Sequence, residues 1–236
     1  MSPSALIVAH GQPSDPAAAA ADLAQLAGRV AAHLPGWRVA SATLAEDGAL
    51  AAALAGLARP LVFPFFMADG WFTATALPDR LAGAGADDLT ILPAFGVMAE
   101  VSELAVRILR EAAEGHGWPA GETEVVLAAH GSGRSPAPAA AAERIAGAVR
   151  AAGFAGVRLG FIEEEPSITD AAVGTGQRAL CLPLFVARWG HVETDVPAAL
   201  ARAAFAGACL PPIGAHPEVP EFIAAELART GDPDGG

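Results

Sequence analysis

The chain has 236 residues, of which 53% are hydrophobic, and a formal net charge of -12 from 26 acidic and 14 basic side chains. This length suits one large or two small domains with enough chain to bury a core. The acidic balance argues against a nucleic-acid partner, because a phosphate backbone is recognised by a basic surface. Apolar runs all fall short of the roughly 18 residues that cross a bilayer, so we expect no membrane association.

The chain begins without the charged and apolar segments of a signal peptide, so we expect a soluble, cytoplasmic protein. Its two cysteines, Cys181 and Cys209, lie in apolar, strand-like contexts outside any C-x-x-C spacing. We therefore expect buried, reduced thiols rather than a disulfide or a zinc site.

The first half alternates short β-rich runs with alanine-rich helical patterns. Asp15 and Pro16 are typical cap and first-turn residues of a helix. The pattern predicts strands at 5–9, 37–44, 61–66 and 89–92, and helices at 16–32, 49–57 and 100–114. A linker at 117–121 follows.

The second half repeats this order. The pattern predicts strands at 124–129, 157–162, 179–185 and 208–210, and helices at 137–152, 168–173, 196–205 and 220–229. Strands that alternate with helices form a parallel sheet with helices on both faces. The fold class is therefore α/β, with two similar doubly wound domains at 1–116 and 122–236, each a four-stranded parallel sheet flanked by helices.

An internal duplication accounts for the repeated order. Equivalent residues lie at offsets of 120, 119 and 118, as in the pairs His10 and His130, Pro64 and Pro183, and Leu92 and Leu210. Such slow drift is what loop-length changes produce in a duplicated domain.

The copies differ in their polar side chains. His130, Glu163 and His191 each follow one of three consecutive predicted strands of the second half, whereas Phe72 stands opposite His191 in the first. In the common doubly wound order the first strand lies between the second and third, so His130 would be flanked by the other two. Two imidazoles and a carboxylate suit divalent Fe, Co, Ni or Zn better than Mg or Ca.

Each of these three residues also has a simpler explanation. A histidine at a strand end is more often a local hydrogen-bonding residue than a ligand, and the acidic run 163–165 is typical of a solvated loop. The metal-site interpretation is favoured because the three residues share one rim in one half while two of them are absent from the other.

Three sequence motifs resemble those of a known family. They are His130-Gly131-Ser132, Glu163 followed by Glu165-Pro166-Ser167-Ile168, and Leu182-Pro183-Leu184-Phe185 with Gly190-His191 and Asp195-Val196-Pro197. In these phrases the chain resembles the CbiX/SirB-type sirohydrochlorin chelatases of the class II chelatase superfamily, in a tandem two-domain form. The resemblance implies a chelatase-like fold and insertion of Co²⁺ or Fe²⁺ into sirohydrochlorin, in cobalamin or sirohaem synthesis, without an organic cofactor.

The resemblance also implies roles for individual residues. His130, Glu163 and His191 would be the catalytic and metal-binding residues, and His10 the relic or partner in the first copy. The glutamate loop is one residue short, so Glu163 and Glu164 both remain candidates for the carboxylate.

As a hypothesis, the two histidines bind the incoming metal and accept pyrrole protons, while the glutamate ligates and neutralises it. Substrate-binding roles are predicted for arginines that match carboxylates and for residues of the apolar walls, namely His10, Arg134, Arg188, Phe72 and Trp189. Since one chain carries both copies, we expect a monomer whose partners are a tetrapyrrole and a divalent metal ion.

Other functions remain open. A non-catalytic tetrapyrrole- or metal-binding protein could have kept the pocket without turnover. A hydrolase using Ser132 or Ser135 is disfavoured because no G-x-S-x-G elbow is present. A nucleotide-binding sheet lacks both the P-loop and a credible G-x-G-x-x-G motif.

Overall fold

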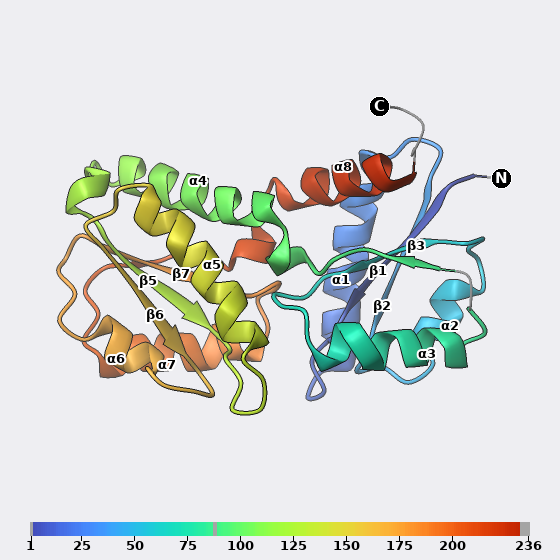
Figure 1. Ribbon diagram of the computed structural model, residues 1–236, viewed down its shortest axis with the longest axis horizontal. Coiled ribbons are helices and arrows are strands. Elements are labelled where there is room, and N and C mark those ends of the chain that lie inside the picture. The colour runs from blue at the N-terminus through green and yellow to red at the C-terminus, as the bar shows by residue number, and fades with distance from the viewer. Residues whose placement is uncertain (1, 87–88, 232–236) are drawn as a thin grey trace. The chain divides into compact units, whose positions relative to one another are not determined.

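The computed structural model describes residues 2–86 and 89–231 (Figure 1). These residues divide into two compact units. Unit 1 consists of residues up to 95 together with those from 217 onwards, and unit 2 of residues 96–216.

Unit 1 contains a parallel sheet in the order β2-β1-β3-β4. Its strands are β1 (Ser4–Ala9), β2 (Arg38–Thr43), β3 (Leu61–Pro64) and β4 (Thr90–Ile91). The helices of this unit are α1 (Pro16–Ala32), α2 (Ala49–Leu54), α3 (Leu77–Gly83) and α8 (Val219–Gly231). One π-helical segment, η1 (Phe72–Ala76), leads directly into α3.

Unit 2 repeats this arrangement with the order β6-β5-β7-β8. Its strands are β5 (Glu124–Ala129), β6 (Gly156–Phe161), β7 (Ala179–Pro183) and β8 (Ala208–Cys209). Its helices are α4 (Ala99–Gly115), α5 (Ala137–Ala151), α6 (Ile168–Ala172) and α7 (Val196–Arg202). A second π-helical segment, η4 (His191–Asp195), leads into α7.

Short 3₁₀ turns complete the described elements. They are Phe95–Val97, Ala120–Glu122 and Ile213–Ala215. The predicted linker at 117–121 therefore ends in one turn of 3₁₀-helix.

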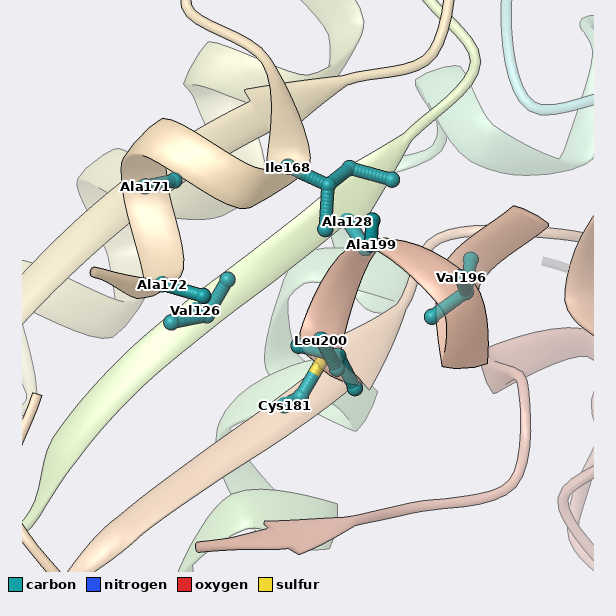
Figure 2. Close-up of a cluster of buried hydrophobic side chains, with 9 residues drawn as sticks. All are labelled: Val126, Ala128, Ile168, Ala171, Ala172, Cys181, Val196, Ala199 and Leu200. Atoms are coloured by element: carbon teal, nitrogen blue, oxygen red, sulfur yellow. The ribbon is translucent and has the colours of Figure 1, made fainter. Parts of the chain in front are cut away.

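The central strand of each sheet is apolar because it is covered on both faces. Every residue of β1 is buried, and so are Val125 to Ala129 of β5. In unit 2, side chains from β5 and β7 meet those of α6 and α7 in one cluster (Figure 2). Its members are Val126, Ala128, Ile168, Ala171, Ala172, Cys181, Val196, Ala199 and Leu200. Burial on both faces is typical of parallel sheets and explains the continuous apolar runs in the sequence.

The last helix of each sequence repeat packs in the other unit. Helix α4 contacts α5 and β7 of unit 2, whereas α8 contacts α1 and β3 of unit 1. Within unit 1, the ring of Phe222 lies edge-on to that of Phe95, with 5.7 Å between centroids. The compact units thus differ from the predicted ranges 1–116 and 122–236 by this exchange. An amphipathic pattern shows that a helix has an apolar face but does not say which sheet that face covers.

The fold class and strand order were predicted correctly, and α1 has the predicted bounds. Helix α3 and both π-helical segments were missed. A π-helix winds with i→i+5 hydrogen bonds and lacks the 3.6-residue period that predicts an α-helix. Within the described part of the chain, no helix has both the length and the apolar character needed to cross a membrane.

Candidate functional site

The three predicted metal-binding residues, His130, Glu163 and His191, lie at one rim of unit 2 and are called the trio below. His130 directly follows β5, Glu163 follows β6, and His191 begins η4 after β7. Since β5 lies between β6 and β7, His130 is flanked by the other two, as the predicted strand order requires. The sheet therefore brings together three side chains that are up to 61 positions apart in the sequence.

The side chains of the trio are neighbours. The rings of His130 and His191 meet edge-on with 4.7 Å between centroids and 85° between planes. His130 Nδ1 lies 3.8 Å from Glu163 Oε2. The exposed fractions of these side chains are 41% for His130, 55% for Glu163 and 49% for His191, so a solute has access to all of them.

Backbone pairing beyond the strands holds Glu163 beside His130. The amide of Glu163 donates to the carbonyl of His130 at 2.9 Å, and the amide of Ile162 donates to that of Ala129 at 3.1 Å. This extension of the β5–β6 ladder keeps the two side chains on adjacent strand ends.

Glu164 has a different role from Glu163. Its Oε1 accepts a hydrogen bond from the amide of Ser132 at 3.0 Å. Gly131 has a φ of +71°, and a Cβ at that position would lie 2.7 Å from the same Oε1. Glu164 therefore packs against the loop after β5, which leaves Glu163 as the carboxylate beside His130.

Both histidines use Nδ1 for local hydrogen bonds. His191 Nδ1 lies 2.7 Å from Asp195 Oδ2, and His130 Nδ1 lies 3.0 Å from the carbonyl oxygen of Gly131. Since a carboxylate and a carbonyl only accept, each Nδ1 carries the hydrogen and donates it. Each neutral ring then keeps a lone pair on Nε2, which can bind a cation or accept a proton.

Asp195 has no predicted role but contacts His191. It occupies the last position of η4, four residues after His191, and a local carboxylate partner of this kind orients a metal-binding histidine. A signal was present in the sequence, because Ala76 stands opposite Asp195 at the same offset of 119 that relates Phe72 to His191.

The trio is close together but does not form a closed cage. Among residues 2–86 and 89–231, no group of three or more His, Cys, Asp or Glu side chains is arranged to hold a metal ion. The trio is an exposed imidazole pair with one adjacent carboxylate.

Unit 1 has the same framework with different chemistry. The ring of Phe72 lies edge-on to that of His10, with 4.6 Å between centroids and 83° between planes. The amide of Ala45 donates to the carbonyl of His10 at 2.9 Å, so Ala45 stands where Glu163 stands in unit 2. The first copy thus keeps one histidine and replaces the second histidine, its aspartate and the glutamate by Phe72, Ala76 and Ala45.

The predicted substrate-binding residues divide between the units. His10 and Phe72 lie together on the rim of unit 1, next to Trp71, whose ring is 5.1 Å from that of Phe72. Arg134 and Arg188 are exposed in the loops after β5 and β7 of unit 2. Trp189, also in unit 2, is partly buried and lies two residues before the start of η4.

The serine residues of the hydrolase alternative stabilise turns. Ser132 Oγ accepts from the amide of Arg134 at 3.2 Å, and Ser135 Oγ accepts from the amide of Ala137 at 3.3 Å. These local contacts give both hydroxyls a structural role and lend no support to a nucleophilic one.

A family model and solved structures are similar to this chain. The CbiX family model matches residues 124–230. A solved structure of CbiX, the terminal enzyme for biosynthesis of siroheme in denitrifying bacteria, is 48% identical, covers 97% of this chain and 98% of its own, and has a TM-score of 0.89. No curated protein matches the chain.

Two more distant structures share the fold. SirB from Bacillus subtilis, solved with Fe³⁺, is 18% identical with a TM-score of 0.76 and covers 100% of this chain and 98% of its own. A multi-domain protein of Deinococcus radiodurans with structural similarity to chelatases is 24% identical with a TM-score of 0.73, and the match covers 100% of this chain and 56% of that one.

Proposed function

The chain belongs to the CbiX family and is a sirohydrochlorin metal chelatase, and we propose that it inserts Fe²⁺ in sirohaem synthesis through His130, Glu163 and His191. The choice of Fe²⁺ over Co²⁺ is supported by the 48% identical CbiX, which acts in siroheme biosynthesis. The residue assignment rests on one observation, the meeting of two imidazoles and a carboxylate at the rim of unit 2.

The proposed reaction exchanges two pyrrole protons of the macrocycle for one dication. Neither the metal nor the ring changes oxidation state in this exchange, so no organic cofactor is required. The protein has to bind the ion, remove part of its water shell and take up the protons.

His130 and His191 are suited to the first and last of these tasks. Their Nδ1 atoms are occupied by Gly131 and Asp195, so Nε2 of each ring is the atom that would bind the ion or accept a proton. Glu163 would neutralise the approaching dication, and Asp195 would position the His191 ring.

The macrocycle offers a planar apolar ring and many carboxylates. On unit 1, Trp71 is 64% exposed and Phe72 is 37% exposed, so both present aromatic surface to solvent. We propose that Arg134, Arg188 and Trp189 of unit 2 contact the macrocycle, and that His10 and Phe72 form a separate contact surface for an apolar ring on unit 1. Guanidinium groups match carboxylates in shape and charge, which would offset the acidity of the chain.

An assay with sirohydrochlorin and Fe²⁺, Co²⁺, Ni²⁺ or Zn²⁺ in turn, without oxygen, tests the activity. We expect the absorption spectrum of the macrocycle to change fastest with Fe²⁺. We expect the His191→Ala variant to insert the metal no faster than the reaction without protein. Faster turnover with Co²⁺ would redirect the proposal to cobalamin synthesis. Tight binding of both substrates without product would instead favour the non-catalytic binding protein.

The oligomeric state is a separate proposal. We expect a monomer, and light scattering on the eluting peak of a size-exclusion column measures it. A dimer mass would overturn this expectation without affecting the assay of metal insertion.

A further inference from the structure

The two cysteines of the chain are direct neighbours in the sheet of unit 2. Cys181 of β7 and Cys209 of β8 are register partners, and the amide of Leu210 donates to the carbonyl of Cys181 at 2.8 Å. Paired residues of parallel strands project from the same face of the sheet, and the strands lie about 4.8 Å apart. This spacing falls within the Cα separations that disulfides span.

The expectation that both thiols are buried was wrong for Cys209. Cys181 is fully buried and its side chain points toward Leu200 of α7 (Figure 2), whereas Cys209 is exposed. Strand β8 is short and lies at the edge of its sheet, so it covers Cys209 incompletely. One thiol is therefore accessible to a solute, and its register partner is buried.

The sulfur atoms already interact. A hydrogen bond from Cys181 lowers the pKa of the Cys209 thiol, and the same contact, with burial, raises the pKa of Cys181. Cys209 therefore has more thiolate character than an ordinary cysteine, and reactivity toward oxidants follows thiolate character and exposure.

Unit 1 shows that this place in the fold does not need sulfur. Its β3 and β4 pair Val62 with Ile91, at the positions equivalent to Cys181 and Cys209. An apolar pair is therefore sufficient for packing, and the second copy has cysteine at both positions rather than at one.

We propose that Cys209 and Cys181 form a reversible redox pair that closes to an intramolecular disulfide in the presence of hydrogen peroxide. The Cys209 thiolate attacks a peroxide oxygen and the O–O bond breaks, so Cys209 becomes a sulfenic acid, and the departing hydroxide takes up the proton that the Cys209 thiol had lost and leaves as water. Cys181 then loses its proton and attacks the Cys209 sulfur, and the S–O bond breaks with release of a second water. The two sulfurs together lose two electrons, which the peroxide gains, and a dithiol reverses the change by exchange.

The test treats the reduced full-length protein with hydrogen peroxide, denatures it in acid, and labels remaining thiols for intact-mass analysis. Reduced wild type should take up two labels and oxidised wild type none, at the mass of a single chain. Treatment with dithiothreitol should restore both labels.

Matched variants take their residues from unit 1. Cys181→Val should stop at the sulfenic acid of Cys209, which dimedone traps, and Cys209→Ile should keep an unoxidised Cys181 that takes one label. The proposal is overturned if oxidised wild type keeps two labelled thiols, forms disulfide-linked dimers, or gives a dimedone adduct at Cys209 without closing. Equal oxidation of Cys181 in the Cys209→Ile variant would also overturn it.

Discussion

The imidazole of His191 lies edge-on to that of His130, with 4.7 Å between the ring centroids. Phe72 and His10 make the same contact in unit 1 at 4.6 Å. Both copies therefore have the same packing of two rings, but only in the second copy are both rings imidazoles. The packing role of His191 can therefore be tested apart from its proposed chemical role.

Replacing His191 by phenylalanine should keep the ring contact and remove the chemistry. We expect kcat/KM for metal insertion to fall about 100-fold or more, the usual contribution of a positioned acid–base group. The absorption change of the macrocycle measures turnover, and circular dichroism verifies the fold. His116→Phe is a matched control, because His116 stacks on Trp118 away from the trio, with 4.4 Å between ring centroids. Equal activity of the two variants would remove His191 from the mechanism.

Asp195 should act through His191. In Asp195→Ala, which introduces the residue found at position 76 of unit 1, we expect Co²⁺ affinity to fall about 10- to 100-fold because Nδ1 loses its acceptor. Asp195→Asn should recover part of this loss, since its amide oxygen still accepts from Nδ1. Titration of the Co²⁺ absorption bands measures both. Glu193→Gln removes a charge from the same π-helical segment and should leave the Co²⁺ affinity unchanged. If Glu193→Gln lost as much Co²⁺ affinity as Asp195→Ala, the loss would be explained by net charge and not by the contact of Asp195 with His191.

Substitution of Glu163 should lower activity, whereas substitution of Glu164 should lower stability. Glu163→Ala is expected to lower turnover while changing the free energy of unfolding by less than about 0.5 kcal/mol, as for an exposed side chain. Glu164→Ala leaves the Ser132 amide without its acceptor and should cost about 1 kcal/mol of stability. Urea unfolding and the insertion assay, applied to both variants, distinguish these roles. Exchange of the two phenotypes would assign the catalytic carboxylate to Glu164.

Gly131 should resist substitution for steric reasons. Its φ is +71°, and an added Cβ would lie 2.7 Å from Glu164 Oε1 and 3.0 Å from the Phe161 Cβ. We expect Gly131→Ala to destabilise the fold by more than about 1 kcal/mol. Gly147→Ala is the control, because Gly147 lies in α5 with no atom near an added Cβ and should gain about 0.5–1 kcal/mol. Thermal unfolding measures both, and equal midpoints would contradict the predicted strain.

The cap of α6 should make stability depend on pH. Hydrogen bonds from the side chain and backbone of Ser167 lower the pKa of Asp170 below its ordinary value of 3.8. A carboxyl with a lowered pKa in the folded state contributes stability above its unfolded pKa and loses it as pH falls through the folded value. The melting temperature of wild type should therefore exceed that of Asp170→Asn at neutral pH, and the difference should shrink in acid. A difference that is constant across this range would contradict the linkage.

The amino-acid sequence by itself determined the order of the strands and of every α-helix except α3, the duplication, and the gathering of His130, Glu163 and His191 at one rim. These follow from local periodicity and from a general rule, because the carboxyl ends of parallel strands share an edge and the first strand lies between the second and third. The family resemblance also came from short phrases of sequence.

Only the tertiary structure decided which contacts and hydrogen bonds those side chains make. The π-helical winding of η4 has no signature in the hydrophobic pattern, yet it places His191 against His130 and Asp195 against His191. The division of labour between Glu163 and Glu164, the exchange of α4 and α8, and the pairing of Cys181 with Cys209 depend on contacts between distant segments. Local periodicity specifies which face of an element is apolar, but strand register and helix packing select its partners.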